Sequence, residues 1–103
     1  MIVTVSHTLI AAGRPNNCYS CPVALAILAT LRAIRPDVKP QIKVTHSNVE
    51  LHSGGDYVRR SLPGEARKFI CNVDAAFPEY EKIKPFSFVL DDLTENEWKR
   101  LAA

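Results

Sequence analysis

Two cysteines separated by two residues form the most compact chemical motif of the sequence, Cys18-Tyr19-Ser20-Cys21, and Pro22 follows directly. A CxxC pair at the start of a helix suits thiol redox chemistry, because the helix dipole lowers the pKa of a thiol placed there. Redox enzymes usually place the nucleophilic cysteine first and a proline between the two cysteines. Here Pro22 comes after both cysteines, so their order argues against redox chemistry.

The same pair could supply half of a zinc site, which needs two further ligands. The remaining cysteine and histidines are Cys71, His7, His46 and His52. None of them forms a second closely spaced pair, so a metal site would have to be assembled from scattered residues. Cys18 and Cys21 are therefore weak metal candidates, and no cofactor is expected. The favoured interpretation is that both are small, semi-buried residues that pack and cap the start of a helix.

No other pattern indicates catalysis. His46 falls on the apolar phase of its predicted strand and His52 on the polar phase, and neither is next to a nucleophile. A cluster of carboxylates in residues 91–97 stands at the start of a predicted helix, where negative charge complements the helix dipole. We therefore expect a protein that is not an enzyme.

A basic patch is the best candidate binding surface. It consists of Arg59, Arg60, Arg67 and Lys68, with Tyr57 close enough in sequence to add a ring for stacking. The simpler alternative, which the sequence favours, is a solvated basic edge that discourages strand-to-strand aggregation. The net charge is only +2. Residues 1–60 carry seven Lys or Arg and three Asp or Glu, and residues 61–103 carry six Lys or Arg and eight Asp or Glu. Nucleic-acid binders usually concentrate more positive charge.

The elements that position these residues follow from the periodicity of the apolar side chains. Alternation with a period of two predicts strands at residues 2–5, 42–46, 49–52, 57–60 and 85–90. Helical spacing and helix-capping residues predict helices at residues 7–12, 22–34, 61–76 and 94–101. The strands and helices do not alternate strictly, so an α+β fold is favoured over a doubly wound α/β fold.

We expect a single α+β domain over residues 1–103, with a small antiparallel sheet packed against two main helices and a short C-terminal helix. A ferredoxin-like split βαβ arrangement is the hypothesis for the core. Pro22 should occupy the first position of a helix that is apolar nearly all round and therefore central. Gly13 should end the first helix in the left-handed conformation. Thr94 and Glu97 form a capping box for the last helix.

Composition limits the class of protein. The chain has 103 residues, of which 47% are apolar, which suits one packed domain. Its longest apolar stretch, from Val23 to Ala29, is far shorter than the ~20 residues of a membrane span. The first residues lack the features of a targeting signal, and three cysteines argue against a secreted disulfide scaffold. We expect a cytoplasmic protein without a membrane partner.

Three segments are informative together. They are Cys18, Cys21, Pro22, Val23, Ala24, Leu25 and Ala26; Leu62, Pro63, Glu65, Ala66, Phe69 and Ile70; and Pro85, Phe86, Ser87 and Phe88. This set resembles small uncharacterised proteins encoded by bacteriophages and prophages, which carry a CxxCP-[IV]-ALA segment early and a PFSF segment late. The resemblance runs from residue 1 to about residue 91, and the helix at 94–101 extends past it. It implies a genomic setting and no established activity.

These observations lead to a main functional hypothesis and two alternatives. The main hypothesis is a non-enzymatic phage or mobile-element protein that binds a host or phage macromolecule, as an inhibitor of a bacterial defence system. The first alternative is a nucleic-acid-binding accessory protein that uses the basic patch. The second is a zinc- or thiol-dependent protein centred on Cys18 and Cys21. A homodimer formed through the exposed edge of the predicted meander is a further hypothesis.

Overall fold

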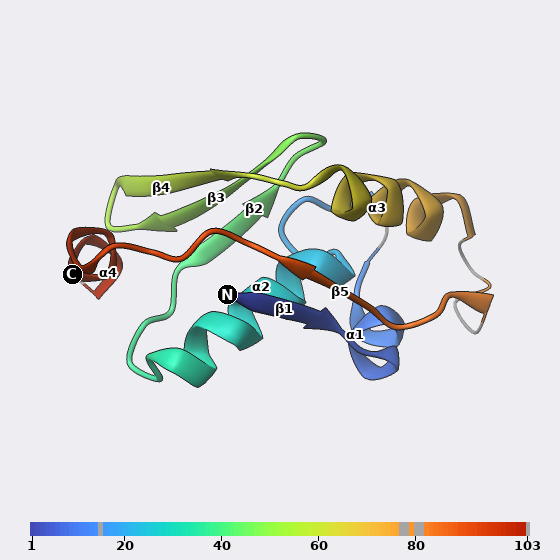
Figure 1. Ribbon diagram of the computed structural model, residues 1–103, viewed down its shortest axis with the longest axis horizontal. Coiled ribbons are helices and arrows are strands. Elements are labelled where there is room, and N and C mark those ends of the chain that lie inside the picture. The colour runs from blue at the N-terminus through green and yellow to red at the C-terminus, as the bar shows by residue number, and fades with distance from the viewer. Residues whose placement is uncertain (15, 77–78, 80–81, 103) are drawn as a thin grey trace.

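The computed structural model describes residues 1–14, 16–76, 79 and 82–102, and it is an α+β fold as expected (Figure 1). The elements in chain order are β1 (Ile2–Val5), α1 (His7–Ala12), α2 (Pro22–Ile34), β2 (Gln41–Val44), β3 (Asn48–Ser53), β4 (Asp56–Ser61), α3 (Gly64–Ala76), β5 (Phe86–Val89) and α4 (Glu95–Ala102). The short C-terminal helix is present as predicted.

The strands form two antiparallel sheets, whereas the sequence predicted one. β2, β3 and β4 make the predicted meander. β1, near the start of the chain, pairs with β5, near its end. The ferredoxin-like hypothesis is therefore wrong, because in the described part of the chain β1 and β5 do not join the strands of the meander. The reason lies in α2. This nearly all-apolar helix contacts both β1 and β2, so it bridges two small sheets instead of covering one.

The entry to α2 follows the predicted pattern. Pro22 occupies its first turn, and Cys21 is the N-cap residue, whose Sγ accepts a hydrogen bond from the Ala24 N–H at 3.4 Å. The prediction for Gly13 is wrong in its mechanism: the residue is extended, with φ −73° and ψ 155°. A Cβ at this position would lie 2.5 Å from Pro22 Cδ. Gly13 is thus required by the close approach of α1 and α2.

The remaining helices use the faces that their sequences indicate. α3 buries Ala66, Phe69 and Val73, three residues of its predicted stripe. In α4 the capping box forms as predicted: the Thr94 N–H donates to Glu97 Oε1 at 2.9 Å, and the Glu97 N–H donates to Thr94 Oγ1 at 3.2 Å. α4 contacts β3 and β4, and no helix among the described residues is long and apolar enough to cross a membrane.

Candidate functional site

The three-stranded sheet has two chemically different faces. Its inner face packs into the core through buried Ile42, Val44, Val49, Leu51 and Val58. Its outer face, defined by the alternate positions, consists of Gln41, Lys43, Asn48, Glu50, His52, Tyr57, Arg59 and Ser61, all exposed or half-buried. A sheet with one solvated face and polar and aromatic side chains on it is available for recognition.

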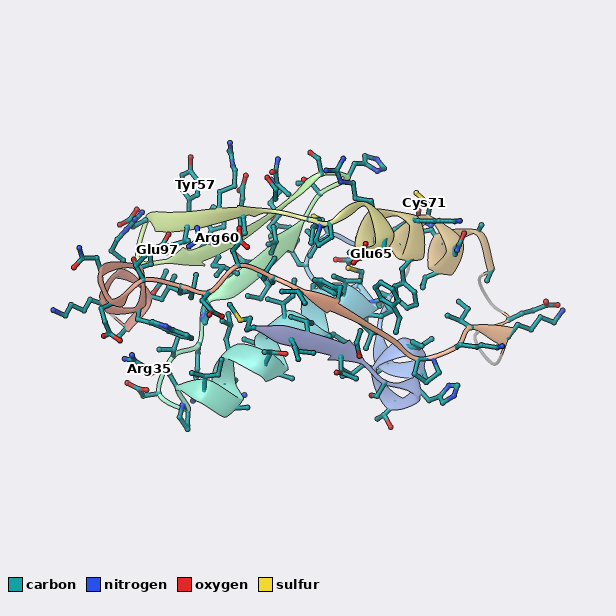
Figure 2. All side chains as sticks on the ribbon, viewed as in Figure 1. Arg35, Tyr57, Arg60, Glu65, Cys71 and Glu97 are labelled. Atoms are coloured by element: carbon teal, nitrogen blue, oxygen red, sulfur yellow. The ribbon has the colours of Figure 1, made fainter. Side chains whose placement is uncertain are left out.

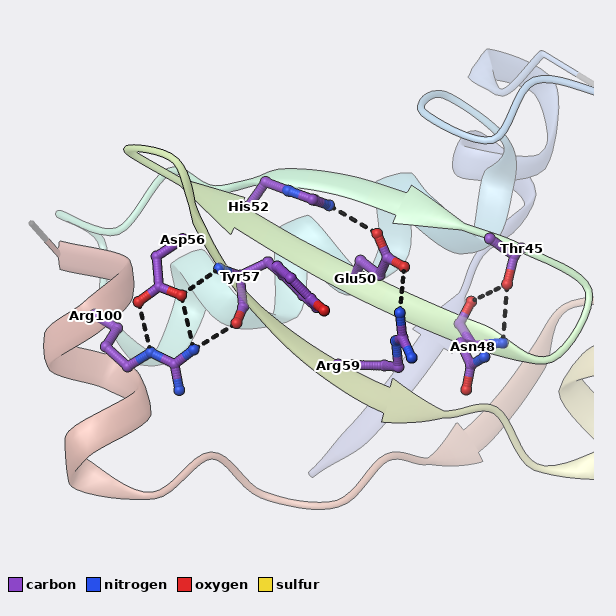
Figure 3. A network of polar contacts seen from close by, with 8 residues as sticks. All are labelled: Thr45, Asn48, Glu50, His52, Asp56, Tyr57, Arg59 and Arg100. Carbon is purple, nitrogen blue, oxygen red and sulfur yellow. Dashed lines mark hydrogen bonds and ion pairs between the residues drawn. The ribbon is translucent and has the colours of Figure 1, made fainter.

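Tyr57 is held in place at the centre of a small network on this outer face (Figure 3). The cross-strand partner His52 stacks on its ring with a centroid distance of 5.3 Å. The guanidinium of Arg59 lies 5.7 Å from the ring centroid. Although both groups lie against its ring, Tyr57 keeps 43% of its surface exposed. The ring is therefore both ordered and accessible.

Glu50 connects the other members of this network. His52 Nε2 hydrogen bonds to Glu50 Oε1 at 2.9 Å, and Arg59 Nη2 donates to Glu50 Oε2 at 3.2 Å. The hydrogen bond from His52, followed by that from Arg59, lowers the pKa of the Glu50 carboxyl. The carboxylate thus stays charged and fixes both side chains beside the tyrosine.

Arg60 lies on the other side of the sheet from Tyr57 (Figure 2). It pairs with Glu97 of α4 and donates to the Asp92 carbonyl oxygen at 3.2 Å. The hydrogen bond from Arg60 is the main cause of the lowered pKa of Glu97. Arg60 is therefore a structural residue that ties α4 to the sheet, and its charge is neutralised. Because successive side chains of a strand point to opposite faces of the sheet, Arg60 and its neighbour Arg59 lie on different faces.

Arg67 and Lys68, the other members of the predicted patch, are exposed on α3. Arg67 Nε donates to the Leu62 carbonyl oxygen at 3.1 Å, which closes the start of that helix. No hydrogen bond, ion pair or ring contact in the described part of the chain joins either residue to Tyr57 or Arg59. The structure therefore brings together Tyr57 and Arg59 only.

The outer edge of β4 is occupied by side chains of the same chain. Arg100 of α4 donates to the Tyr57 carbonyl oxygen at 2.6 Å, and Arg60 donates to the Arg59 carbonyl oxygen at 2.9 Å. The Tyr57 N–H donates to Asp56 Oδ1 at 2.8 Å. Edge strands that are blocked in this way resist pairing with another strand.

The cysteines differ in their environments. Cys21 is buried, Cys18 is half-buried, and Cys71 is exposed on α3. Burial raises the pKa of the Cys21 thiol, which also serves as the cap of α2. Among the residues that the structure describes, no three His, Cys, Asp or Glu side chains gather to hold a metal ion. The position of Cys21 fits the packing and capping role.

A cavity of about 340 Å³ that the sequence did not reveal lies beside the cysteines. Its walls come from the loop before α2, from β2 and the turn after it, and from α3. They are lined by Asn16, Asn17, Cys18, Cys21, Lys43, Val44, Thr45, His46, Ile70 and Asp74. Only the tertiary structure joins these three segments, so no local pattern could have indicated the site.

Comparison with known proteins found no matching family profile, no matching curated protein and no matching solved structure.

Proposed function

We propose that this is a non-enzymatic binding protein that recognises another macromolecule through the outer face of the β2-β3-β4 sheet, with Tyr57 and Arg59 at its centre. The observation that carries the proposal is the exposure of a Tyr57 ring that contacts both the ring of His52 and the guanidinium of Arg59. Tyrosine and arginine are frequent binding hot spots. Side chains already fixed before binding lose little conformational entropy when a partner covers them.

The charges on this face support a protein partner over a nucleic acid. Glu50 lies in its middle and already neutralises Arg59. Arg60, a further cation of the predicted patch, is paired with Glu97 on the other side of the sheet. Nucleic-acid binding depends on several cations that are free to replace the counterions of phosphate groups. Lys43 is the remaining lysine or arginine of the outer face, which leaves little free positive charge.

The partner that we propose is a host or phage protein, and the place of action is the cytoplasm of a bacterial host. The support for this part is the resemblance of the segments around Cys18, Leu62 and Phe86 to phage- and prophage-encoded proteins. Inhibition of a bacterial defence system is the activity proposed, since a protein that binds without catalysing a reaction acts by occupying a surface of its target.

The test is a capture experiment from a lysate of the organism that carries the gene. Tagged wild-type protein is compared with Tyr57→Ala and Arg59→Gln. The matched controls are Tyr19→Ala, which removes a tyrosine of similar exposure (48%), and Arg32→Gln, which removes an exposed arginine of α2. Circular dichroism establishes that all variants are folded.

We expect a specific partner to be retained by the wild type and both controls, and to bind at least about tenfold more weakly to Tyr57→Ala, as for a hot-spot residue. Equal capture by Tyr57→Ala and the wild type would overturn the choice of surface. Retention on DNA or RNA that falls steeply with salt and is lost with Arg59→Gln would favour the nucleic-acid alternative instead.

A further inference from the structure

The cavity beside the cysteines has the location and size of a ligand-binding pocket. It lies between the loop that precedes α2, the end of β2 and the side of α3. Its volume of about 340 Å³ is at the lower end of the range of about 300–1,000 Å³ found for ligand pockets. A molecule of amino-acid size fits such a volume better than a nucleotide does.

The loop that forms one wall is fixed at several points, so the cavity is preformed. The Val44 N–H donates to the Cys18 carbonyl oxygen at 2.7 Å, which attaches the loop to the edge of β2. Asn17 Oδ1 accepts hydrogen bonds from the next turn of the loop. The Asn16 N–H donates to Asp74 Oδ1 at 3.0 Å, which attaches the loop to α3.

The lining combines apolar side chains with two opposite charges. Cys18, Cys21, Val44 and Ile70 supply the apolar part. The ammonium group of Lys43 makes no hydrogen bond or ion pair with any described residue, and its charge is one of the smaller causes that lower the pKa of Glu50, its cross-strand neighbour. Asp74 accepts one hydrogen bond, at Oδ1, and its Oδ2 accepts none from the described residues. One cation and one anion that line the same cavity are therefore available to a ligand.

We infer that this cavity binds a small zwitterion with an apolar side chain, that is, a free α-amino acid such as leucine. The carboxylate of the ligand pairs with Lys43, its ammonium group with Asp74 Oδ2, and its side chain packs on Val44 and Ile70. The charges of the lining complement both charges of the ligand. An interior segment of a peptide carries neither charge, so it does not satisfy this lining. The site shares Lys43 with the outer face of the sheet, but His52, Tyr57 and Arg59 do not line the cavity.

The test is a titration of ¹⁵N-labelled protein, followed by amide chemical shifts, with L-leucine and three analogues that each lack one feature. Leucinamide lacks the carboxylate, N-acetyl-leucine lacks the ammonium group, and glycine lacks the apolar side chain. We expect leucine to shift the amides of residues 16–18, 43–46 and 70–74, and to bind at least about tenfold more tightly than each analogue, because two analogues lose a charged contact and glycine loses the apolar contact.

Two variants and a matched control assign the charges. Lys43→Gln should remove the preference for leucine over leucinamide, and Asp74→Asn the preference for leucine over N-acetyl-leucine. The amide oxygen of the new asparagine still accepts the hydrogen bond from Asn16, so the loop stays in place. Lys39→Gln removes an exposed lysine outside the cavity and should bind as the wild type does.

Three results would overturn the inference: no shifts at tens of millimolar leucine, shifts confined to residues outside the cavity, or leucinamide and leucine binding to the wild type equally. Because the capture experiment uses Tyr57 and Arg59, failure of either test leaves the other informative.

Discussion

Arg100 of α4 forms a bidentate ion pair with Asp56 at the start of β4, through two parallel hydrogen bonds. Arg100 Nε lies 2.8 Å from Asp56 Oδ2 and Nη2 lies 2.9 Å from Oδ1 (Figure 3). Nη2 also donates to the carbonyl oxygen of Tyr57, which is the residue at the centre of the proposed binding surface. The C-terminal helix thus fixes the strand that carries Tyr57 and blocks its outer edge at the same time.

The first prediction concerns the acid stability of this contact. The hydrogen bonds from Arg100, followed by the one from the Tyr57 N–H, lower the pKa of Asp56 to about 2 from an ordinary value of 3.8. A carboxyl whose pKa is lower in the folded state stabilises the fold above its unfolded pKa, and this stabilisation is lost as the pH falls towards the folded pKa. Between pH 4 and pH 2, thermal unfolding midpoints should therefore fall more steeply for the wild type than for Asp56→Asn.

The matched control is Asp91→Asn, because Asp91 is exposed and forms no ion pair with the described residues. Its midpoints should follow the wild type across the same pH range. If the unfolding midpoints of the wild type and Asp56→Asn fell in parallel as the pH is lowered, the bidentate contact between Asp56 and Arg100 would not contribute to stability in solution.

How far the fold could be predicted depends on the range of the interactions involved. The capping box of Thr94 and Glu97 is local, so its residues could be identified directly and the contact is confirmed. The division of the strands into two sheets depends on α2 packing against β1 and β2 at once. An all-round apolar helix indicates that its sides are covered, but it does not indicate by which strands.

The candidate site shows the same limit. Alternation along β4 separates Arg60 from Tyr57 and Arg59, and this signal was present in the sequence. That Arg60 pairs with Glu97 could not be inferred, because the two residues are 37 positions apart. The cavity is lined by three segments that are distant in the sequence, so no local sequence pattern indicates it.

The second prediction concerns the glycine between α1 and α2. A methyl group on Gly13 would lie 2.5 Å from Pro22 Cδ and 2.6 Å from the backbone nitrogen of Pro22. Gly13→Ala should therefore lower the free energy of unfolding by about 1–3 kcal/mol, as overpacking does. Gly64→Ala is the control, since a Cβ there meets nothing within 4 Å. It should stabilise the protein by about 0.4–1 kcal/mol through the unfolded chain. Urea denaturation measures both; equal effects would contradict the steric account.

The third prediction concerns the order in which the thiols react. Cys71 is exposed, Cys18 half-buried and Cys21 buried, and burial raises the pKa of the Cys21 thiol. Because the thiolate is the reactive form, a disulfide reagent at neutral pH should modify Cys71 first and Cys21 last. Peptide mapping after timed quenching gives the order. Rapid modification of Cys21 would contradict a capping role, and protection of both Cys18 and Cys21 by added zinc would support the metal alternative.

The last prediction concerns the anchor of α4. Trp98 is the only tryptophan of the chain; it is 6% exposed and the guanidinium of Arg35 lies 5.1 Å from its ring. Trp98→Ala should lower the free energy of unfolding by about 3–5 kcal/mol, because it leaves a large cavity under α4. Lys99→Ala, an exposed change on the next residue, should be nearly neutral. Denaturant unfolding followed by circular dichroism measures both.

If Trp98 holds α4 in place, its loss should also free the edge of β4, since Arg100 donates to the Tyr57 carbonyl oxygen only while the helix is docked. Trp98→Ala should then expose the Tyr57 backbone and promote self-association, measured by light scattering at increasing concentration. A Trp98→Ala protein that is destabilised as expected but stays monomeric would show that the side chains from within the sheet, Arg60 and Asp56, block this edge without α4.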